Sequence, residues 1–353
     1  MSHLDLRQAL EFAHYARLHR GTTFVAALGA GVAVADLLLD LKLLAAYGLP
    51  GVVVVPRADA ELAEVARLEG LPITRVEASR PGSLRSALAM GQVPVVPVDQ
   101  GPADGAVEAV ATALALELGA RRLLLLRTAH PALDDSLRTG HLTREEVLER
   151  ADEAGDAGAQ WRQIASLLAA GVPGVVLLPG RPGALFEELF THDGAGVLLG
   201  GAVVERVREA TLADAADLHL LLKAEMARGV VKPVSDRQIA ATAHEHLVIT
   251  IDGLVVGTAR LAPYGTWAEM SRFATLPRYR GRGRARTLGL ALIERARQLG
   301  FADLFALSVD ARMWRFFESL GLEAIEREAL PASWQAGYDF ARPSRAFHRR
   351  LAP

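Results

Sequence analysis

The chain has 353 residues, of which 51% are hydrophobic and 23% are charged, and its formal net charge at pH 7 is -2. This length favours two domains, and the slightly negative charge argues against a nucleic acid or an anionic membrane surface as the main partner, which leaves small-molecule chemistry. The absence of cysteine excludes disulfides, thiolate metal sites and cysteine nucleophiles, and we expect no metal.

The N-terminal segment is predicted to form an amphipathic helix from Asp5 to His19, because apolar residues recur at helical spacing and Gly21 follows. This helix can pack on its own domain or take part in a subunit contact. The segment does not have the pattern of a signal peptide, and no apolar run in the chain reaches the length of a membrane span. We therefore expect a cytoplasmic protein.

Short apolar runs alternate with helical segments, such as Ala35 to Tyr47, through the N-terminal half. The alternation predicts a three-layer α/β domain with a mainly parallel sheet. A glycine-rich stretch from Gly194 to Gly201 marks the boundary, so we expect domains at 1–200 and 201–353. The predicted strands are Thr23 to Leu28, Gly51 to Val55, Gln92 to Val98, Arg122 to Leu126 and Val175 to Leu178.

The C-terminal half has a different order of elements, which predicts an α+β domain. A hairpin with an Asp252-Gly253 turn is followed by a strand, a glycine loop, a helix and a further strand. In chain order we expect a strand at Val203 to Ala210, helices at Ala213 to Arg228 and Asp236 to Glu245, strands at Leu247 to Ile251, Leu254 to Leu261 and Ala268 to Leu276, a helix at Thr287 to Leu299, a strand at Ala302 to Ser308, a helix at Ala311 to Leu320 and two late strands.

The glycine loop is the most informative motif of the chain. Its glycines allow the backbone to approach a ligand closely, and the N-terminus of the following helix offers unpaired N–H groups and the positive end of a dipole. An anionic pyrophosphate fits such a place. Alternate arginines from Arg278 to Arg286 either add to this attraction or form a solvated basic face. The loop residues are Arg280, Gly281, Arg282, Gly283, Arg284 and Ala285.

The order of elements and this loop resemble the GNAT acyltransferase family, whose loop motif is Q/R-x-x-G-x-G/A. Arg280, Gly283 and Ala285 match that motif. The resemblance implies that acetyl-CoA is the donor, that backbone N–H groups of the loop hold its pyrophosphate, and that the preceding strand splays from its neighbour to admit the thioester. It also implies an oxyanion site formed by strand N–H groups near Phe273, Ala274 and Thr275.

Acetyl transfer to an amine requires a neutral amine, a stabilised oxyanion and a protonated thiolate leaving group. Glu269 lies at the start of the predicted splayed strand, where a carboxylate can take the ammonium proton. Ser308 ends the next strand, where its hydroxyl can donate a proton to sulfur. Taken alone, Glu269 is also compatible with a solvated edge residue and Ser308 with a helix cap.

The chain also resembles the N-acetylglutamate synthase family, which catalyses the first step of arginine biosynthesis. The matches are an E-x7-P segment from Glu269 to Pro277, the segment LFALSVDARMWRFF, and a late LP…Y…R-x-S segment that ends at Arg342 and Ser344. The resemblance implies that L-glutamate is the acceptor, that Glu269 is the general base and Ser308 the candidate acid, and that Arg342 and Ser344 bind a carboxylate of glutamate.

Two N-terminal segments, from Arg20 to Val25 and from Pro182 to Leu199, resemble the amino acid kinase fold of arginine-sensitive synthases and kinases. This resemblance implies assembly into a homo-oligomer through the N-terminal domain and an L-arginine effector site at Glu188 and Gly194. A carboxylate can pair with a guanidinium through two hydrogen bonds. Glu188 is also compatible with a solvated helix charge.

Departures from the family pattern keep alternatives open. An active kinase of this fold needs a lysine and paired glycines where the chain reads AALGA, from Ala26 to Ala30, so we expect no kinase activity. Val234 stands where the synthases have an arginine, and Lys232 or Arg260 can supply the missing charge. The alternatives are a GNAT acetyltransferase for another amino acid or small amine, and a non-catalytic sensor of arginine or acetyl-CoA.

Overall fold

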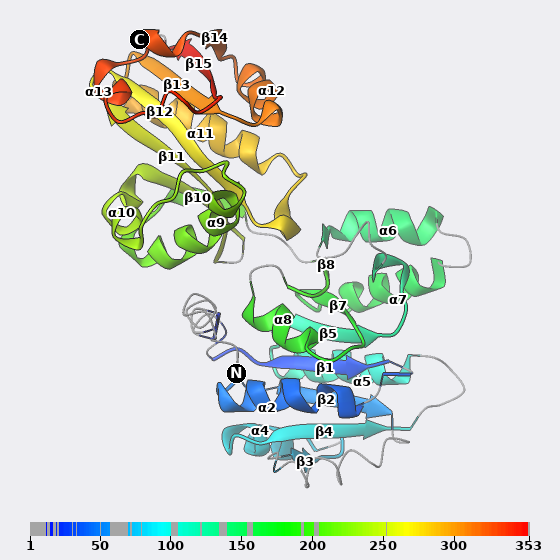
Figure 1. The fold of residues 1–353 in the computed structure, drawn as a ribbon. Helices are drawn as coiled ribbons and strands as arrows, with labels where there is room; N and C mark the ends of the chain where they lie inside the picture. The colour runs from blue at the N-terminus through cyan, green and yellow to red at the C-terminus, as the bar shows by residue number, and fades with distance from the viewer. Residues whose placement is uncertain are drawn as a thin grey trace. The chain divides into compact units, whose positions relative to one another are not determined.

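In the computed structural model the chain divides into two compact units, Met1–Ala202 and Val203–Pro353 (Figure 1). The predicted N-terminal helix lies mainly outside the described residues, as do Ala30 and Asp252. No helix among the described residues is long and apolar enough to cross a membrane. The structure describes residues 12, 15–16, 19, 21–29, 31–32, 34–49, 51–56, 70, 73–78, 80–99, 105–120, 122–133, 140–153, 158–191, 194–200, 205–251 and 253–351.

The described part of the N-terminal unit forms an eight-stranded sheet in the order β3-β4-β2-β1-β5-β7-β8-β6. The strand pairs are parallel except for β7 with β8, which confirms a mainly parallel sheet. The central strands are buried along their whole length because helices cover both faces. The strands are β1 (Phe24–Leu28), β2 (Gly51–Pro56), β3 (Ile73–Arg75), β4 (Val93–Val98), β5 (Arg122–Arg127), β6 (His141–Leu142), β7 (Val175–Pro179) and β8 (Val197–Leu199).

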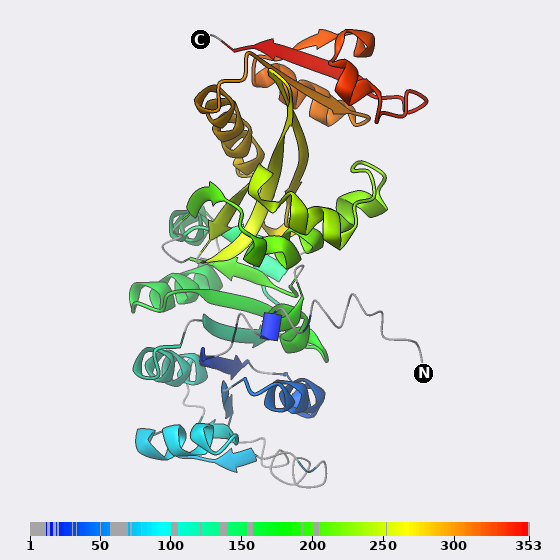
Figure 2. The ribbon, with the colours of Figure 1, turned by 90° about the vertical axis from the view of Figure 1, so that its left-hand side faces the viewer.

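Helices form the outer two layers of this unit. The described helices are η1 (Val34–Leu37), α2 (Leu38–Ala46), α4 (Pro81–Ala89), α5 (Ala106–Glu117), η2 (Pro131–Leu133), α6 (Arg144–Glu153), α7 (Gly158–Ala169) and α8 (Ala184–Phe190). Figure 2 shows α2 and α8 on one face of the sheet and α5 and α7 on the other, as a three-layer domain requires. Strand β8 lies inside the predicted boundary stretch but pairs with β6 and β7, so the middle of that stretch belongs to the sheet.

The C-terminal unit contains a seven-stranded sheet in the order β14-β15-β13-β12-β11-β10-β9. Its strands are β9 (Glu205–Glu209), β10 (His246–Ile251), β11 (Leu254–Tyr264), β12 (Trp267–Thr275), β13 (Asp303–Ser308), β14 (Glu323–Ile325) and β15 (Arg345–Arg350). Its helices are η4 (Leu212–Asp214), α9 (Ala215–Ala227), α10 (Asp236–Ala241), η5 (Ala243–Glu245), η6 (Pro277–Tyr279), α11 (Arg284–Gln298), α12 (Ala311–Ser319), η7 (Arg327–Ala329) and α13 (Ala332–Gln335).

This unit has the predicted α+β architecture. Helices α9 and α11 lie on opposite faces of the sheet (Figure 2). Their apolar sides, including Leu218 and Leu292, meet one continuous core with β10, β11 and β12. Helix α11 begins at Arg284, three residues earlier than predicted, because Gly283 adopts a left-handed conformation and forms the N-cap.

Strands β12 and β13 separate in the middle of the sheet. They pair in parallel from Trp267 with Asp303 to Met270 with Ala306, and beyond this point both strands continue without pairing with each other. On its other side, β12 carries a bulge opposite β11, where Arg272 has a φ of 54°. A bulge re-aims side chains, and a positive φ is unusual for a residue other than glycine. The sheet is therefore open and locally distorted at the same place.

Candidate active site

The separation of β12 from β13 opens into a cavity of about 890 Å³ in the C-terminal unit. Its lining comes from the loop after α9, strands β11 and β12, the glycine loop, the end of β13 and the segment around α13. The volume suits a small-molecule site. The structure thus brings together the residues of this unit that the sequence predicts for the site, except Arg282, which does not line the cavity.

Glu269 lies on β12, next to the point of separation, and its side chain faces the cavity. Burial raises the pKa of its carboxyl above the usual value, while Arg260 and Arg272 and a hydrogen bond from the Trp334 indole act in the opposite direction. A carboxylate held in this way is a better proton acceptor than an exposed one. The surroundings of Glu269 therefore suit a general base.

Arg272 is a functional candidate that the sequence did not reveal. Its Nη1 atom is buried and has no hydrogen-bond partner among the described residues, and the same holds for the neighbouring Ser271 Oγ. Burial, together with the charge of Arg260, lowers the pKa of Arg272 to about 10. Since buried polar groups are nearly always paired, a carboxylate of a ligand is the natural partner for these atoms. No motif marks Arg272, and its orientation depends on the bulge.

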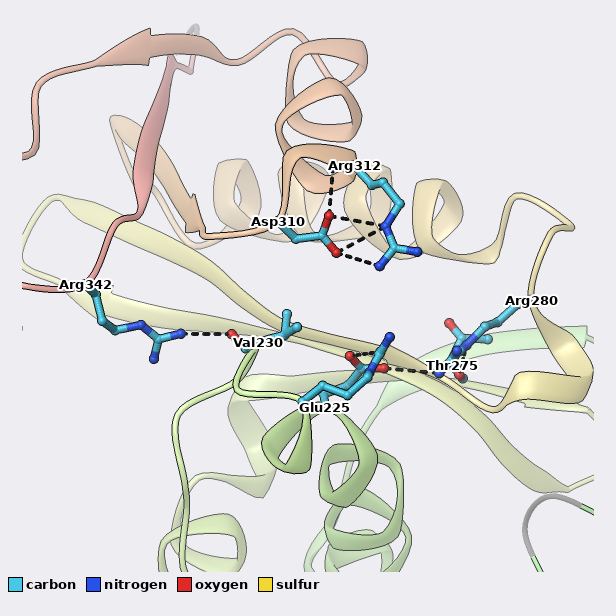
Figure 3. A network of polar contacts seen from close by, with 8 residues as sticks. Glu225, Val230, Thr275, Arg280, Asp310, Arg312 and Arg342 are labelled. Atoms are coloured by element: carbon cyan, nitrogen blue, oxygen red, sulfur yellow. Dashed lines mark hydrogen bonds and ion pairs between the residues drawn. The ribbon is translucent and has the colours of Figure 1, made fainter.

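The arginines predicted to bind the acceptor substrate have hydrogen-bond partners within the described part of the chain, unlike the Nη1 atom of Arg272. Arg260 donates from Nε to the Glu245 carboxylate over 2.6 Å, so its charge is already balanced. Arg342 donates to the carbonyl oxygen of Val230 over 3.4 Å (Figure 3) and to that of Gly229 over 2.8 Å. These bonds tie the loop after α9 to the C-terminal segment, and both lie at the edge of the cavity.

A second contact joins the same two segments. The Lys232 ammonium lies 4.5 Å from the centre of the Tyr338 ring, a cation–π contact. The Tyr338 hydroxyl is hydrogen-bonded to Ser344. Val234 is partly buried among apolar side chains of the core and lines the cavity, so this position contributes no charge to the lining.

The glycine loop exposes backbone at the other end of the cavity. Gly281 and Gly283 have φ values of +79° and +74°, and a Cβ atom at either position would meet nothing within 4 Å. The first turn of α11 follows directly, with N–H groups that have no partner inside the helix. This arrangement can hold an anion such as a pyrophosphate.

The arginine side chains of the loop bind mainly to the protein. Arg280 donates to the Thr275 carbonyl over 2.9 Å and to the Glu225 carboxylate over 3.1 Å (Figure 3). Arg284 is buried and points into the fold, and Arg286 donates to the Ser319 carbonyl over 3.0 Å. Arg280 and Arg286 are nevertheless exposed, whereas Arg278 and Arg284 are buried, so only part of this set of arginines forms a solvated basic face.

Ser308 ends β13 on the other side of the opening and is buried. Its hydroxyl oxygen accepts the N–H of Asp310 over 3.0 Å, which leaves the hydroxyl hydrogen to be donated elsewhere. The Ser308 carbonyl accepts the Trp314 indole N–H over 2.8 Å, so the residue is held at two atoms. This geometry is compatible with the predicted acid.

In the N-terminal unit, Glu188 is not a solvated helix charge. Its side chain is buried, lies 3.4 Å from Arg122, and accepts the N–H groups of Ala195 and Gly196 over 3.1 and 3.3 Å. Gly194 precedes this turn with a φ of +63°. The carboxylate therefore holds the turn between α8 and β8, and its role toward arginine remains a prediction.

Residues 216–322, which lie within the C-terminal unit, match the acetyltransferase (GNAT) family. Within the described residues, no group of three or more histidine or acidic side chains could hold a metal ion.

Sequence similarity further relates the chain to bacterial amino-acid acetyltransferases. It is 31% identical over 267 residues to that of Pseudomonas putida and 34% identical over 259 residues to that of Azotobacter vinelandii. Each alignment covers 70% of this chain and 58% of the relative, so the chain spans less than two thirds of the relatives it matches.

A structural comparison extends to both units. The fold is similar to that of N-acetylglutamate synthase from Neisseria gonorrhoeae complexed with coenzyme A and L-arginine, with a TM-score of 0.60 and 21% identity. The match covers 99% of this chain and 100% of the other. It confirms the predicted fold, a mostly parallel α/β unit followed by a GNAT unit.

Proposed function

We propose that the chain is an amino-acid N-acetyltransferase that transfers the acetyl group of acetyl-CoA to the α-amine of L-glutamate. The observation that carries the proposal is the pair formed by Glu269 and Arg272 in the opening between β12 and β13. One residue can take a proton from an ammonium group, and the other can bind a carboxylate. An amino acid presents both groups.

The proposed reaction is a direct transfer. Glu269 takes a proton from the ammonium group, through water or directly, and the neutral amine attacks the thioester carbon. Backbone N–H groups near Phe273, Ala274 and Thr275 stabilise the oxyanion as the C–N bond forms. The C–S bond then breaks, the Ser308 hydroxyl protonates the thiolate of coenzyme A, and the proton that the new amide nitrogen loses restores the Ser308 hydroxyl.

The cationic groups around the cavity suit an acceptor with two carboxylates. Arg272 and Ser271 offer buried unpaired atoms near Glu269, while Lys232, Arg342 and Ser344 lie on the two segments that close the cavity. Arg272 provides the charge that is missing at Val234. Arg260 is paired with Glu245, so it acts mainly through the electrostatic effect of its charge and not through a direct bond to the acceptor.

The coenzyme is proposed to bind through the backbone of the glycine loop. Gly281, Gly283 and the first turn of α11 supply N–H groups for the pyrophosphate, with Arg282 and Ala285 beside them. In this placement the pantetheine arm runs along the part of β12 that does not pair with β13. The acetyl group then lies in the opening between these two strands.

The N-terminal unit is proposed to have a regulatory and assembly role rather than a catalytic one. A Cβ at Gly29 would lie 2.7 Å from Arg127 Cδ, so this side chain fills the space at the end of β1. Arg127 is held there by Glu108 over 2.8 Å and Gln163 over 2.9 Å. This packing leaves little room for nucleotide phosphates and supports the loss of kinase chemistry.

L-Arginine is proposed as an effector that binds near Glu188 and Gly194, and the N-terminal units are proposed to assemble into a symmetric homo-oligomer. The support is the sequence resemblance of the two N-terminal segments. Light scattering with and without L-arginine tests the assembly, and a monomer under both conditions would remove that part of the proposal.

The catalytic proposal is tested by release of coenzyme A from acetyl-CoA with a panel of amino acids and small amines, with and without L-arginine. Turnover with L-glutamate well above that with other amines supports it. Turnover with a different amine favours the acetyltransferase of other specificity that Val234 suggests. Coenzyme A binding without turnover on any amine favours a sensor.

A further inference from the structure

Two glutamates of β9 form ion pairs with arginines of α11. Glu205 pairs with Arg284 and Glu209 pairs with Arg295. Both pairs join β9 to α11, but they lie at opposite ends of the helix. Arg284 is the first residue of α11 and part of the glycine loop, whereas Arg295 lies near the other end of the helix.

The Arg284 pair is the more buried of the two. The Arg284 side chain is only 6% exposed, compared with 21% for Arg295. Arg284 Nε donates to Glu205 over 3.0 Å, and its Nη1 donates to the Tyr279 carbonyl over 2.8 Å. The Arg284 guanidinium therefore connects strand β9 to Tyr279, the residue that precedes the glycine loop.

This connection closes the glycine loop. Tyr279 ends η6 and Arg284 begins α11, so the bond between them spans the loop, which contains Gly281 and Gly283 in left-handed conformations. Glycines confer flexibility, and a flexible loop must be ordered before its N–H groups can converge on an anion. Without Glu205, the buried guanidinium would lack its counter-charge and would be drawn toward solvent, away from the Tyr279 carbonyl.

We propose that Glu205 is a positioning residue for coenzyme binding, which acts through Arg284 to fix the shape of the glycine loop. It does not touch the coenzyme itself. The inference rests on the proposed use of acetyl-CoA.

The test compares Glu205→Gln with Glu209→Gln in the full chain. Calorimetric titration with coenzyme A measures affinity without turnover. We expect the Kd to rise about 5- to 30-fold in Glu205→Gln, the range that corresponds to loss of one buried ionic contact, and to stay within about 2-fold of the wild type in Glu209→Gln. In steady-state kinetics, Glu205→Gln should raise the KM for acetyl-CoA and leave kcat and the KM for the acceptor unchanged.

Glu205→Asp, which keeps the charge, should recover part of the lost affinity. A purely structural role would lower the thermal stability without a selective rise in the KM for acetyl-CoA. Thermal unfolding of the variants checks that the N- and C-terminal units remain folded. Equal coenzyme affinities for Glu205→Gln and Glu209→Gln would overturn the inference. A wild-type chain that does not bind coenzyme A would instead overturn the proposed function.

Discussion

Replacement of Glu269 by glutamine is the most informative single change. The amide has nearly the same size as the carboxylate but cannot accept a proton at neutral pH. Loss of a general base reduces the rate by about 10²- to 10⁴-fold. We therefore expect kcat to fall in this range, while the Kd for coenzyme A stays the same because the glycine loop lies at the other end of the cavity.

The raised pKa of Glu269 also predicts how the rate depends on pH in the wild type and in the variants. Because burial raises the pKa of Glu269, the deprotonated form becomes populated at a higher pH than for an exposed glutamate. The wild-type rate should rise with pH through this raised pKa, and Glu269→Gln should lose that limb. Arg272→Gln removes a charge that lowers the Glu269 pKa, so it should move the limb to higher pH.

The assay is coenzyme A release at saturating acetyl-CoA and acceptor, from acidic to mildly alkaline pH. Glu323→Gln is the matched control, because Glu323 is exposed on strand β14 and lies outside the cavity. Equal rates for wild type and Glu269→Gln at every pH would refute the reasoning. A loss of rate equally large in Glu323→Gln would show that the assay reports something other than the base.

Three further predictions test other parts of the site and the fold. Arg272→Gln should raise the KM for the acceptor about 10- to 100-fold, since a hydrogen bond to a charged group contributes about 1.5–3 kcal/mol. Gly283→Ala and Gly265→Ala should each cost about 1–2 kcal/mol of unfolding free energy at their positive φ, but only Gly283→Ala should weaken coenzyme A binding. The Arg208 ion pair lowers the pKa of Asp214 to about 2, so Asp214→Asn should cost about 1 kcal/mol at neutral pH, measured by urea unfolding, and the difference should fade as the pH drops from about 4 toward about 2.

Much of the fold was predictable because each element carries a local signal. Strand β12 was predicted within one residue of its bounds, and the strands of the N-terminal sheet are continuous apolar runs. Short strands were missed, because β3 has only three residues, none of them buried. Strand β8 was taken as part of a boundary, because its flanking glycines are typical of linkers as well as of tight packing against a sheet.

The site was predictable to the level of segments but not of side-chain directions. The motifs identified β12 and the glycine loop, yet alternation of arginines cannot show which of them point outward. Arg284 turns inward to Glu205, and Arg280 is held by Glu225, because both acidic partners come from distant segments. Arg272 faces the cavity through a bulge that no sequence pattern marks.

The central claim is that this chain makes N-acetyl-L-glutamate. The most direct test incubates the full chain with acetyl-CoA and L-glutamate and measures N-acetyl-L-glutamate by mass spectrometry, with Glu269→Gln as the comparison. We expect one N-acetyl-L-glutamate for each coenzyme A released by the wild type, and at least about 10²-fold less from Glu269→Gln. Release of coenzyme A with no N-acetyl-L-glutamate, or turnover of another amine only, would contradict the claim.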